Sequence, residues 1–276
     1  MKQYQPIQTD QPTMKLKNCA LNLCALFLAA SASAGVAPSK NPTPLAPAPE
    51  QNLGLTLDVG YDTVDVWQGV RFGDNWVSTG VAFERDVNET VGFRLDSRYG
   101  VAADDSFRDF GDSSYQRLEL GAMATVDLQA VELGLGYRWF HQMGAVGDFL
   151  DDSNQVGATL TKEIGPVAVG VAGYYDFASG GWIFNADVGG NFAVTDRISI
   201  LPSAGVIYSL DHEYWEPYFE PLDGFVSVNL RLAVSIKLTD NASLVPYIAA
   251  RLPIDALDDE GSDDLLYGGV QLSVSF

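Results

Sequence analysis

The stretch Val226-Ser-Val-Asn-Leu-Arg-Leu-Ala-Val-Ser-Ile236 decides the fold class, because apolar side chains occupy every second position in it. Successive side chains of a β-strand point to opposite faces. A period of two therefore predicts a strand with one apolar face and one polar or small face, whereas a helix would need apolar residues three and four apart.

The same alternation recurs along most of Leu53–Phe276 and predicts about twelve strands. No run of eighteen apolar residues exists that could form a membrane-spanning helix. Alternation fits a soluble β-sandwich as well as a membrane barrel, so other features must separate the two. An even number of strands favours the barrel, since single-chain barrels of bacterial outer membranes are built that way.

The connections between the expected strands alternate in length, which favours the barrel again. The short ones are Asp86–Glu89, Asp127–Gln129, Ile164–Pro166, Val194–Arg197 and Thr239–Asn241. The longer ones, apart from the brief Ala178–Gly181, are Thr63–Asp74, Ala102–Ser114, His141–Asn154, Ser209–Gly224 and Pro253–Asp264. Outer-membrane barrels have short periplasmic turns and longer extracellular loops. We therefore predict an all-β fold, a closed antiparallel transmembrane β-barrel with this asymmetry.

Aromatic residues gather where the strands meet the longer connections. Rings with an apolar body and a polar tip suit the interface between lipid and water. The expected interface residues are Tyr61, Trp76, Tyr99, Trp139, Trp182, Tyr208 and Tyr267. Outer-membrane lipid and lipopolysaccharide are therefore expected partners.

The chain ends on Tyr267-Gly-Gly-Val-Gln-Leu-Ser-Val-Ser-Phe276, an alternating strand with a terminal phenylalanine. This ending resembles the signal read by the barrel-assembly machinery. We expect Phe276 to act as the assembly signal and that machinery to be a partner.

The N-terminal segment predicts export. Lys15 and Lys17 precede a short apolar run, and Ala32-Ser33-Ala34 gives a small-residue cleavage pattern, as in a secretory signal peptide. The expected divisions are a signal peptide over 1–34, a proline-rich periplasmic linker over 35–51 and the barrel over 52–276, exported by the Sec pathway to a Gram-negative outer membrane. Both cysteines precede residue 34, and neither follows the small residue that a lipoprotein signal needs.

The formal net charge is −20, which argues against nucleic acid as a partner, because phosphates would be repelled. Most of the acidity falls in the longer connections. One hypothesis is an acidic mouth that concentrates cations. The other is that these carboxylates bind divalent cations bridging to lipopolysaccharide.

The face opposite the apolar one is rich in glycine, alanine and serine, for example at Gly80, Gly136 and Gly170. Eight strands leave an interior about filled by side chains, and sixteen or more leave an aqueous channel. Small inward residues favour an open bore in a barrel of twelve, and hence a porin that lets small solutes diffuse passively through a narrow lumen. The acidic mouth is the reason to expect a preference for cations. Glycines that only permit tight curvature of the wall are the alternative.

Charged residues on the same face are the candidates for a constriction in the lumen. They are Arg94, Asp96, Arg98, Arg117, Glu119, Arg138, Asp187 and Arg231. Folding the chain about Asp127–Gln129 places Glu119 opposite Arg138. The group could set selectivity, or it could consist of salt bridges that brace the wall.

Two features together resemble the TorF-like porins, a family of small outer-membrane barrels. One is Val64-Asp-Val-Trp-Gln-Gly-Val-Arg-Phe-Gly-Asp-Asn75, and the other is the strand layout up to Phe276, with Pro202 and Pro246 inside strands. Gln68 stands where that family's pattern has arginine. The resemblance implies passive transport and leaves the solute open.

An enzyme is the less favoured reading. His141 and His212 are the chain's two histidines and its candidate bases at neutral pH. His141 is followed by Gln142 and Met143 rather than by a serine nucleophile two positions on, as outer-membrane phospholipases would have it. Asp211 and His212 are adjacent, whereas the Asp/His pair of omptin-like proteases would be spaced by one residue. We expect no catalytic residues, cofactor or metal, with a non-conducting structural or adhesion barrel and an outer-membrane hydrolase as alternatives.

Overall fold

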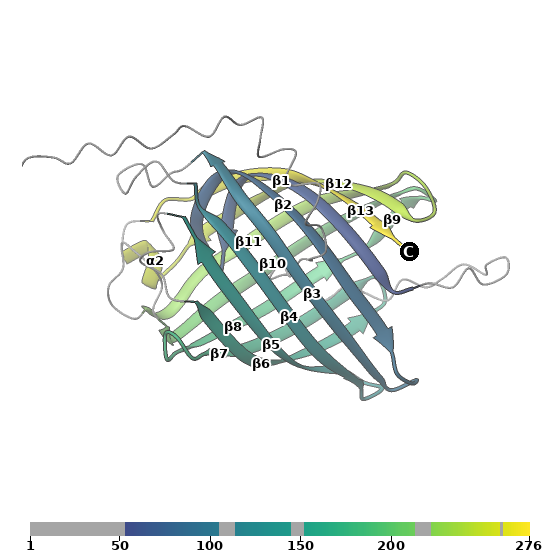
Figure 1. The fold of residues 1–276 in the computed structure, drawn as a ribbon, viewed down its shortest axis with the longest axis horizontal. Helices are drawn as coiled ribbons and strands as arrows, with labels where there is room; N and C mark the ends of the chain where they lie inside the picture. Colours follow the sequence, from purple (N-terminus) through teal and green to yellow (C-terminus); the bar gives the residue numbers. More distant parts are fainter. Residues whose placement is uncertain (1–52, 105–113, 145–151, 213–221, 260–261) are drawn as a thin grey trace, which may run out of the picture.

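The computed structural model describes residues 53–104, 114–144, 152–212, 222–259 and 262–276. The predicted signal peptide and linker lie outside these residues. Thirteen strands and one short helix make up the described part (Figure 1). The strands are β1 (Leu55–Trp67), β2 (Val70–Asp86), β3 (Val91–Asp104), β4 (Gln116–Asp127), β5 (Glu132–Met143), β6 (Ser153–Ile164), β7 (Val167–Asp176), β8 (Trp182–Gly190), β9 (Phe192–Thr195), β10 (Ile198–His212), β11 (Leu222–Lys237), β12 (Ala242–Pro253) and β13 (Leu265–Ser275), and the helix is α2 (Ala256–Asp259).

The strands form one closed antiparallel sheet. Each strand pairs with the next in the chain, except that β8 and β9 are separated only by Asn191 and both pair with β10. They act as one interrupted strand, so the wall of the barrel consists of twelve strands, as predicted. The ring closes where β1 pairs with β13, with Leu57 opposite Val274. Closure gives each of the other twelve strands at least two hydrogen-bonded neighbours, while the short β9 pairs with β10 alone. A sheet in hydrocarbon needs such closure, because no water there can satisfy a free edge.

Side chains alternate between an outward apolar face and an inward face that is small or polar. Val59, Leu135, Val171 and Ile248 point outward, with exposed fractions of 52% to 60%. These residues are not packed against a second sheet, which excludes the sandwich. Among the described helices, none has the length and hydropathy to cross a membrane.

The two ends of the barrel differ, and we call them the turn end and the loop end. At the turn end, connections of two to four residues join β2 to β3, β4 to β5, β6 to β7, β9 to β10 and β11 to β12. Side chains fix these turns locally: the Asn88 carboxamide oxygen accepts hydrogen bonds from the backbone N–H groups of Thr90 and Val91. The longer connections lie at the loop end, and 105–113, 145–151, 213–221 and 260–261 are outside the described residues.

One predicted loop is wrong. The sequence pattern assigned Thr63–Asp74 to a long connection, but β1 and β2 continue through it and meet in the two-residue turn Gln68-Gly69. Both turn residues have positive φ, 50° and 84°. Such backbone angles suit tight hairpin turns, whose twist matches that of the flanking strands.

Candidate functional site in the lumen

The β1–β2 hairpin, residues 63–73, bends into the barrel at its loop end. The strand register shifts between Asp65 and Val66, a bulge that re-aims the tip. The tip then reaches strands that are not its neighbours in the sheet. A Cβ added at Gly69 would lie 2.6 Å from the Ser227 Oγ of β11, and the Gly69 carbonyl oxygen accepts a hydrogen bond of 3.1 Å from Arg251 of β12.

Apolar side chains from the hairpin and from the facing wall fill this half of the lumen. Trp67 packs edge-on against Phe72 and Phe140, with ring centroids 5.3 and 5.0 Å apart. Phe72 stacks on Tyr115 at 5.5 Å. The buried cluster continues to the far wall and consists of Val70, Phe72, Trp76, Ala102, Tyr115, Ile183, Ile207 and Val226. The hairpin therefore closes the loop end with a small hydrophobic core of its own.

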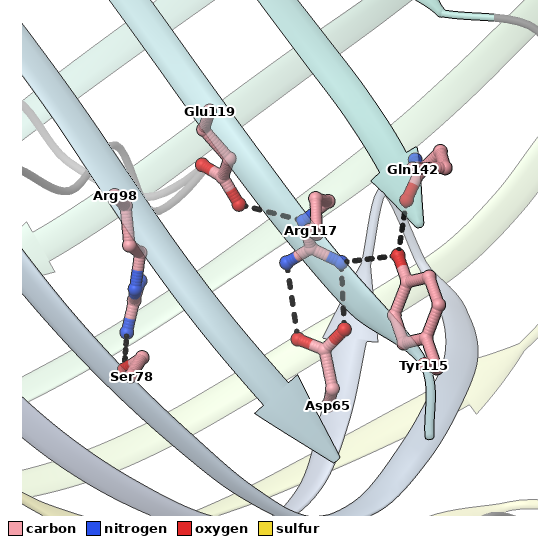
Figure 2. Close-up of polar contacts among 7 residues, drawn as sticks. All are labelled: Asp65, Ser78, Arg98, Tyr115, Arg117, Glu119 and Gln142. Atoms are coloured by element: carbon pink, nitrogen blue, oxygen red, sulfur yellow. Dashed lines mark hydrogen bonds and ion pairs between the residues drawn. The ribbon is translucent and has the colours of Figure 1, made fainter. Parts of the chain in front are cut away.

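Arg117 of β4 ties the hairpin to the wall (Figure 2). Its two terminal nitrogens lie 2.6 and 3.2 Å from the carboxylate oxygens of Asp65, a bidentate ion pair, and its Nε lies 2.7 Å from Glu119. Arg117 also donates to the Tyr115 hydroxyl, which in turn donates to Gln142. The side chains of Arg117 and Asp65 are only 4% and 7% exposed. Charged hydrogen bonds of this geometry are strong where water is excluded.

The Arg117 guanidinium also faces two indole rings. Its Cζ lies 5.4 Å from the Trp67 ring centroid and 5.0 Å from that of Trp76. Such cation–π contacts gain strength when the cation is desolvated. The pair with Asp65 and the contact with Trp67 both join wall to hairpin, so we call the Asp65–Arg117 ion pair the latch.

The turn-end half of the lumen is hollow. A cavity of about 470 Å³ lies there, lined by β1 to β8 and β13. Its lining includes the small residues Gly92, Gly121, Gly136 and Gly170. The charged residues in the lining are six carboxylates and two guanidiniums, namely Asp58, Glu84, Asp86, Asp96, Glu132, Asp187, Arg94 and Arg138. The cavity wall is thus acidic in balance.

The eight charged residues predicted for the lumen separate into different places. Arg94, Asp96, Arg138 and Asp187 line the cavity, whereas Arg117 belongs to the latch and Glu119 pairs with it. Between these levels, Arg98 donates to Ser78 at 2.9 Å (Figure 2). Arg231 lies over the Tyr247 ring, outside the cavity lining. The structure therefore does not gather them into one constriction.

The predicted pairing of Glu119 with Arg138 is wrong. Glu119 lies opposite Phe140, and Arg138 lies opposite Gly121. The cause is the place and length of the turn: Asp127 pairs with Glu132, so the connection is 128–131, whereas the prediction folded the chain about Asp127–Gln129. The expected pair is displaced by two residues along the strand, and Glu119 instead binds Arg117.

Two of the predicted interface aromatics point inward. Trp76 is 1% exposed and packs against Tyr115. Tyr267 lies opposite Ala249, which is buried in the lumen, and its ring meets that of Tyr247. Both residues follow the period of their strands, and that period assigns them to the inward face whatever their chemical character.

The other predicted interface aromatics, Tyr61, Tyr99, Trp139, Trp182 and Tyr208, lie on the outward face. Two of them, Trp182 and Tyr208, belong to a continuous row of rings that crosses β7 to β11 near the loop end. Neighbouring ring centroids in this row lie 5.2 to 6.4 Å apart. The row runs through Tyr175, Trp182, Phe184, Tyr208 and Phe225. A girdle of this kind is typical of barrels at the edge of a membrane.

The two histidines each face a carboxylate. His141 lies on the outward face, with its Nδ1 2.6 Å from Asp152. The structure places His212 inside the barrel at the end of β10, where its Nε2 lies 3.4 Å from Asp176; the prediction had placed it in the middle of a loop. Ser153 donates its hydroxyl hydrogen to the same Asp176 carboxylate. In this geometry the carboxylate separates the hydroxyl from the imidazole, which is not the order of a nucleophile activated by histidine.

Among the residues that the structure describes, no group of three or more His, Cys, Asp or Glu side chains could hold a metal ion.

A closed twelve-stranded antiparallel barrel with an apolar outer face is the architecture of the integral β-barrel proteins of outer membranes. No protein-family model matches the chain, and no curated protein matches its sequence. Among solved structures, an outer membrane channel from Pseudomonas putida has a TM-score of 0.52 at 12% identity, covering 84% of this chain and all of that one. The translocator domain of the autotransporter NalP from Neisseria meningitidis has a TM-score of 0.50 at 13% identity, covering 82% of this chain and 90% of that one. The KdgM porin aligns at 0.49 and 10%, over 80% and 99%. At such identities the likeness concerns the fold.

Proposed function

We propose that the protein is an outer-membrane channel through which small solutes, cations above all, diffuse passively. The observation that carries the proposal is the 470 Å³ cavity inside the barrel, whose charged lining residues are acidic in balance. Carboxylates around an aqueous path raise the local concentration of cations and repel anions. The route would run from the turn end through the cavity and out at the loop end when the hairpin is displaced.

The test is a recording from planar bilayers containing the purified full chain, with a gradient of KCl across the membrane. We expect discrete conductance steps and a reversal potential of the sign given by a potassium-selective path. A reversal potential of the chloride-selective sign contradicts cation preference. A folded protein that produces no steps, even with its hairpin shortened, contradicts the channel and favours the structural or adhesion barrel.

Neutralising carboxylates of the cavity lining should reduce the selectivity of the channel for cations over anions. Glu84→Gln combined with Asp187→Asn removes two of the lining carboxylates, so the reversal potential is expected to move toward zero. Asp240→Asn is the matched control at an exposed turn. The hydrogen bond from Lys237 lowers the pKa of the Asp240 carboxyl, so this control removes a full charge at neutral pH as well. An equal shift in both variants would show that surface charge, rather than the cavity, sets the preference.

Membership of the TorF-like porins is part of the proposal, and it rests on the segment Val64–Asn75 and the strand layout. Export by the Sec pathway is proposed from the signal-peptide pattern up to Ala34, and insertion beside lipopolysaccharide from the barrel and its outward aromatic residues. The hydrolase alternative makes a different prediction. Purified protein would cleave lipid or peptide, and His141→Ala or His212→Ala would abolish that cleavage.

Assembly is proposed to depend on the last residue. The Phe276 ring is half exposed on the outward face, and its backbone pairs with Leu53 and Leu55 where the barrel closes. Phe276→Ser keeps these backbone bonds and removes the ring. We expect less assembled barrel in membranes, measured by heat-modifiable migration on gels, while the purified variant refolds as well as the native chain in detergent. Equal membrane levels would contradict the role of Phe276 as an assembly signal.

A further inference from the structure

We propose that the β1–β2 hairpin is a gate, which the latch holds shut and which leaves the lumen as a unit when the channel opens. The inference rests on the proposed channel function and adds the device that controls it.

The hairpin is separate from the wall in its backbone pairing. β1 pairs with β13 from Thr56 to Asp62, and β2 pairs with β3 from Asp74 to Asp86. Between these limits, the strand ladder joins the two arms of the hairpin only to each other. The hairpin can therefore swing about its base without breaking a β-ladder of the twelve-stranded wall.

Side chains hold the hairpin in the lumen, and each contact can be broken while the barrel stays intact. The latch joins Asp65 to Arg117, the Trp67 ring packs on Phe140, and the Gly69 carbonyl oxygen binds Arg251. Burial of Trp67, Val70 and Phe72 favours the closed position, since leaving it exposes apolar surface to water. The closed state is therefore the resting state.

The latch suits a reversible contact better than an apolar pair would. The free energy lost when two charges leave water offsets much of the free energy gained from their attraction. A buried ion pair therefore adds little net stability, although its geometry is specific. When the hairpin leaves, Asp65 regains water at the outer surface. Arg117 keeps its contact with Glu119, 2.7 Å away, and so is not left as an unpaired buried charge. The second carboxylate thus lowers the free energy of the open state.

The wall is shaped to receive the tip. A bulge lies in β11, where Tyr208 pairs with Phe225 and Ile207 with Ser227. The residue between them, Val226, turns inward and is fully buried beneath the tip, although the sequence period assigns it to the outward face. Gly69 is the residue that allows this approach, because it has a φ of 84° and a Cβ there would contact Val226 and Ser227. Bulges of this kind occur where a side chain must be re-aimed for a purpose.

A disulfide tests the gate directly. The two cysteines of the chain, Cys19 and Cys24, precede the predicted cleavage site, so Gly69→Cys with Ser227→Cys would carry the only thiols of the mature protein. We expect the oxidised pair to be silent in bilayers, and addition of reductant to the same membrane to restore openings. Each single variant, unchanged by oxidant, is the control. Equal conductance in the oxidised and reduced pair would overturn the gate and leave the channel intact.

A second variant does not depend on cross-linking at a strained glycine. Asp65→Asn keeps the shape of the side chain, removes the latch charge and leaves Arg117 with Glu119. We expect the open probability to rise about tenfold, less than when a buried charge is left unpaired, because Arg117 keeps its contact with Glu119. Asp74→Asn is the matched control, since it removes the partially exposed Arg71–Asp74 pair at the base of the same hairpin. The gate is contradicted if the two variants open alike. If none of these proteins conducts although each is a folded barrel, the proposed channel function fails, and the gate fails with it.

Discussion

Replacement of Val66–Phe72 by Asn-Gly is expected to turn a mostly closed barrel into an open pore. Asp65 and Gly73 lie opposite each other in the hairpin, so a two-residue turn can join them, and Asn-Gly suits the positive φ angles of such a turn. The change removes Trp67, Val70 and Phe72 from the lumen and leaves all twelve wall strands paired. Conductance should rise roughly tenfold or more, because the loop-end half is no longer filled by side chains.

The measurement is the time-averaged conductance of equal amounts of the two proteins in planar bilayers. Gln68→Asn is the control, because it alters the same turn at unchanged length and asparagine tolerates a positive φ. An unchanged conductance in the shortened protein would show that another segment closes the lumen. Loss of the folded barrel would show that the hairpin is part of the wall after all.

The second large effect is expected on stability. Val171 lies at the middle of β7 on the outward face and is 52% exposed. Val171→Arg places a charge in the hydrocarbon, which costs about 2–4 kcal/mol near the midplane of a transmembrane barrel. Asn185→Arg, on the neighbouring strand, faces the cavity instead and should change the free energy of unfolding by much less.

Urea titration of both variants in lipid vesicles, with tryptophan fluorescence as the signal, gives the two free energies. The sign of the difference between the two free energies is decisive. If Asn185 faced lipid and Val171 faced the lumen, Asn185→Arg would be the more destabilising variant. Greater destabilisation by Asn185→Arg would contradict the assignment of the two faces.

The strand pattern could be predicted from the sequence because lipid and lumen impose opposite chemistry on alternate residues. The structure confirms the twelve strands of the wall and the inward placement of the charged residues from Arg94 to Arg231. The alternation also placed Trp76 on the inward face, together with Ser78 and Gly80. Its chemical character suggested an interface, and in the structure the strand period decides its position. On β13 the strand period likewise places Tyr267 on the inward face.

Residues that act across the lumen were harder to predict. Asp65 was assigned to a loop, and its partner Arg117 is 52 positions away in the chain, so no local pattern connects the two. One signal was present nevertheless. Gln68-Gly69 stands between apolar residues on both sides, which is the pattern of a hairpin turn rather than of a long loop. The inward bend depends on the bulge at Asp65 and on packing against Ile207 and Val226, which are contacts between distant parts of the sequence.

The proposed channel and its gate both require a lumen that is accessible from the turn end and closed at the loop end by the β1–β2 hairpin. Thr159 lines the cavity, so Thr159→Cys reports access to it, since Cys19 and Cys24 both precede the predicted cleavage site. The direct measurement is the labelling rate of this thiol by a water-soluble, membrane-impermeant reagent applied to one side of an oriented membrane. We predict fast labelling from the turn side, slow labelling from the loop side, and fast labelling from both sides once the hairpin is shortened. Equal rates from both sides of the full-length protein would contradict the closed loop end, and no labelling from either side would contradict an aqueous lumen.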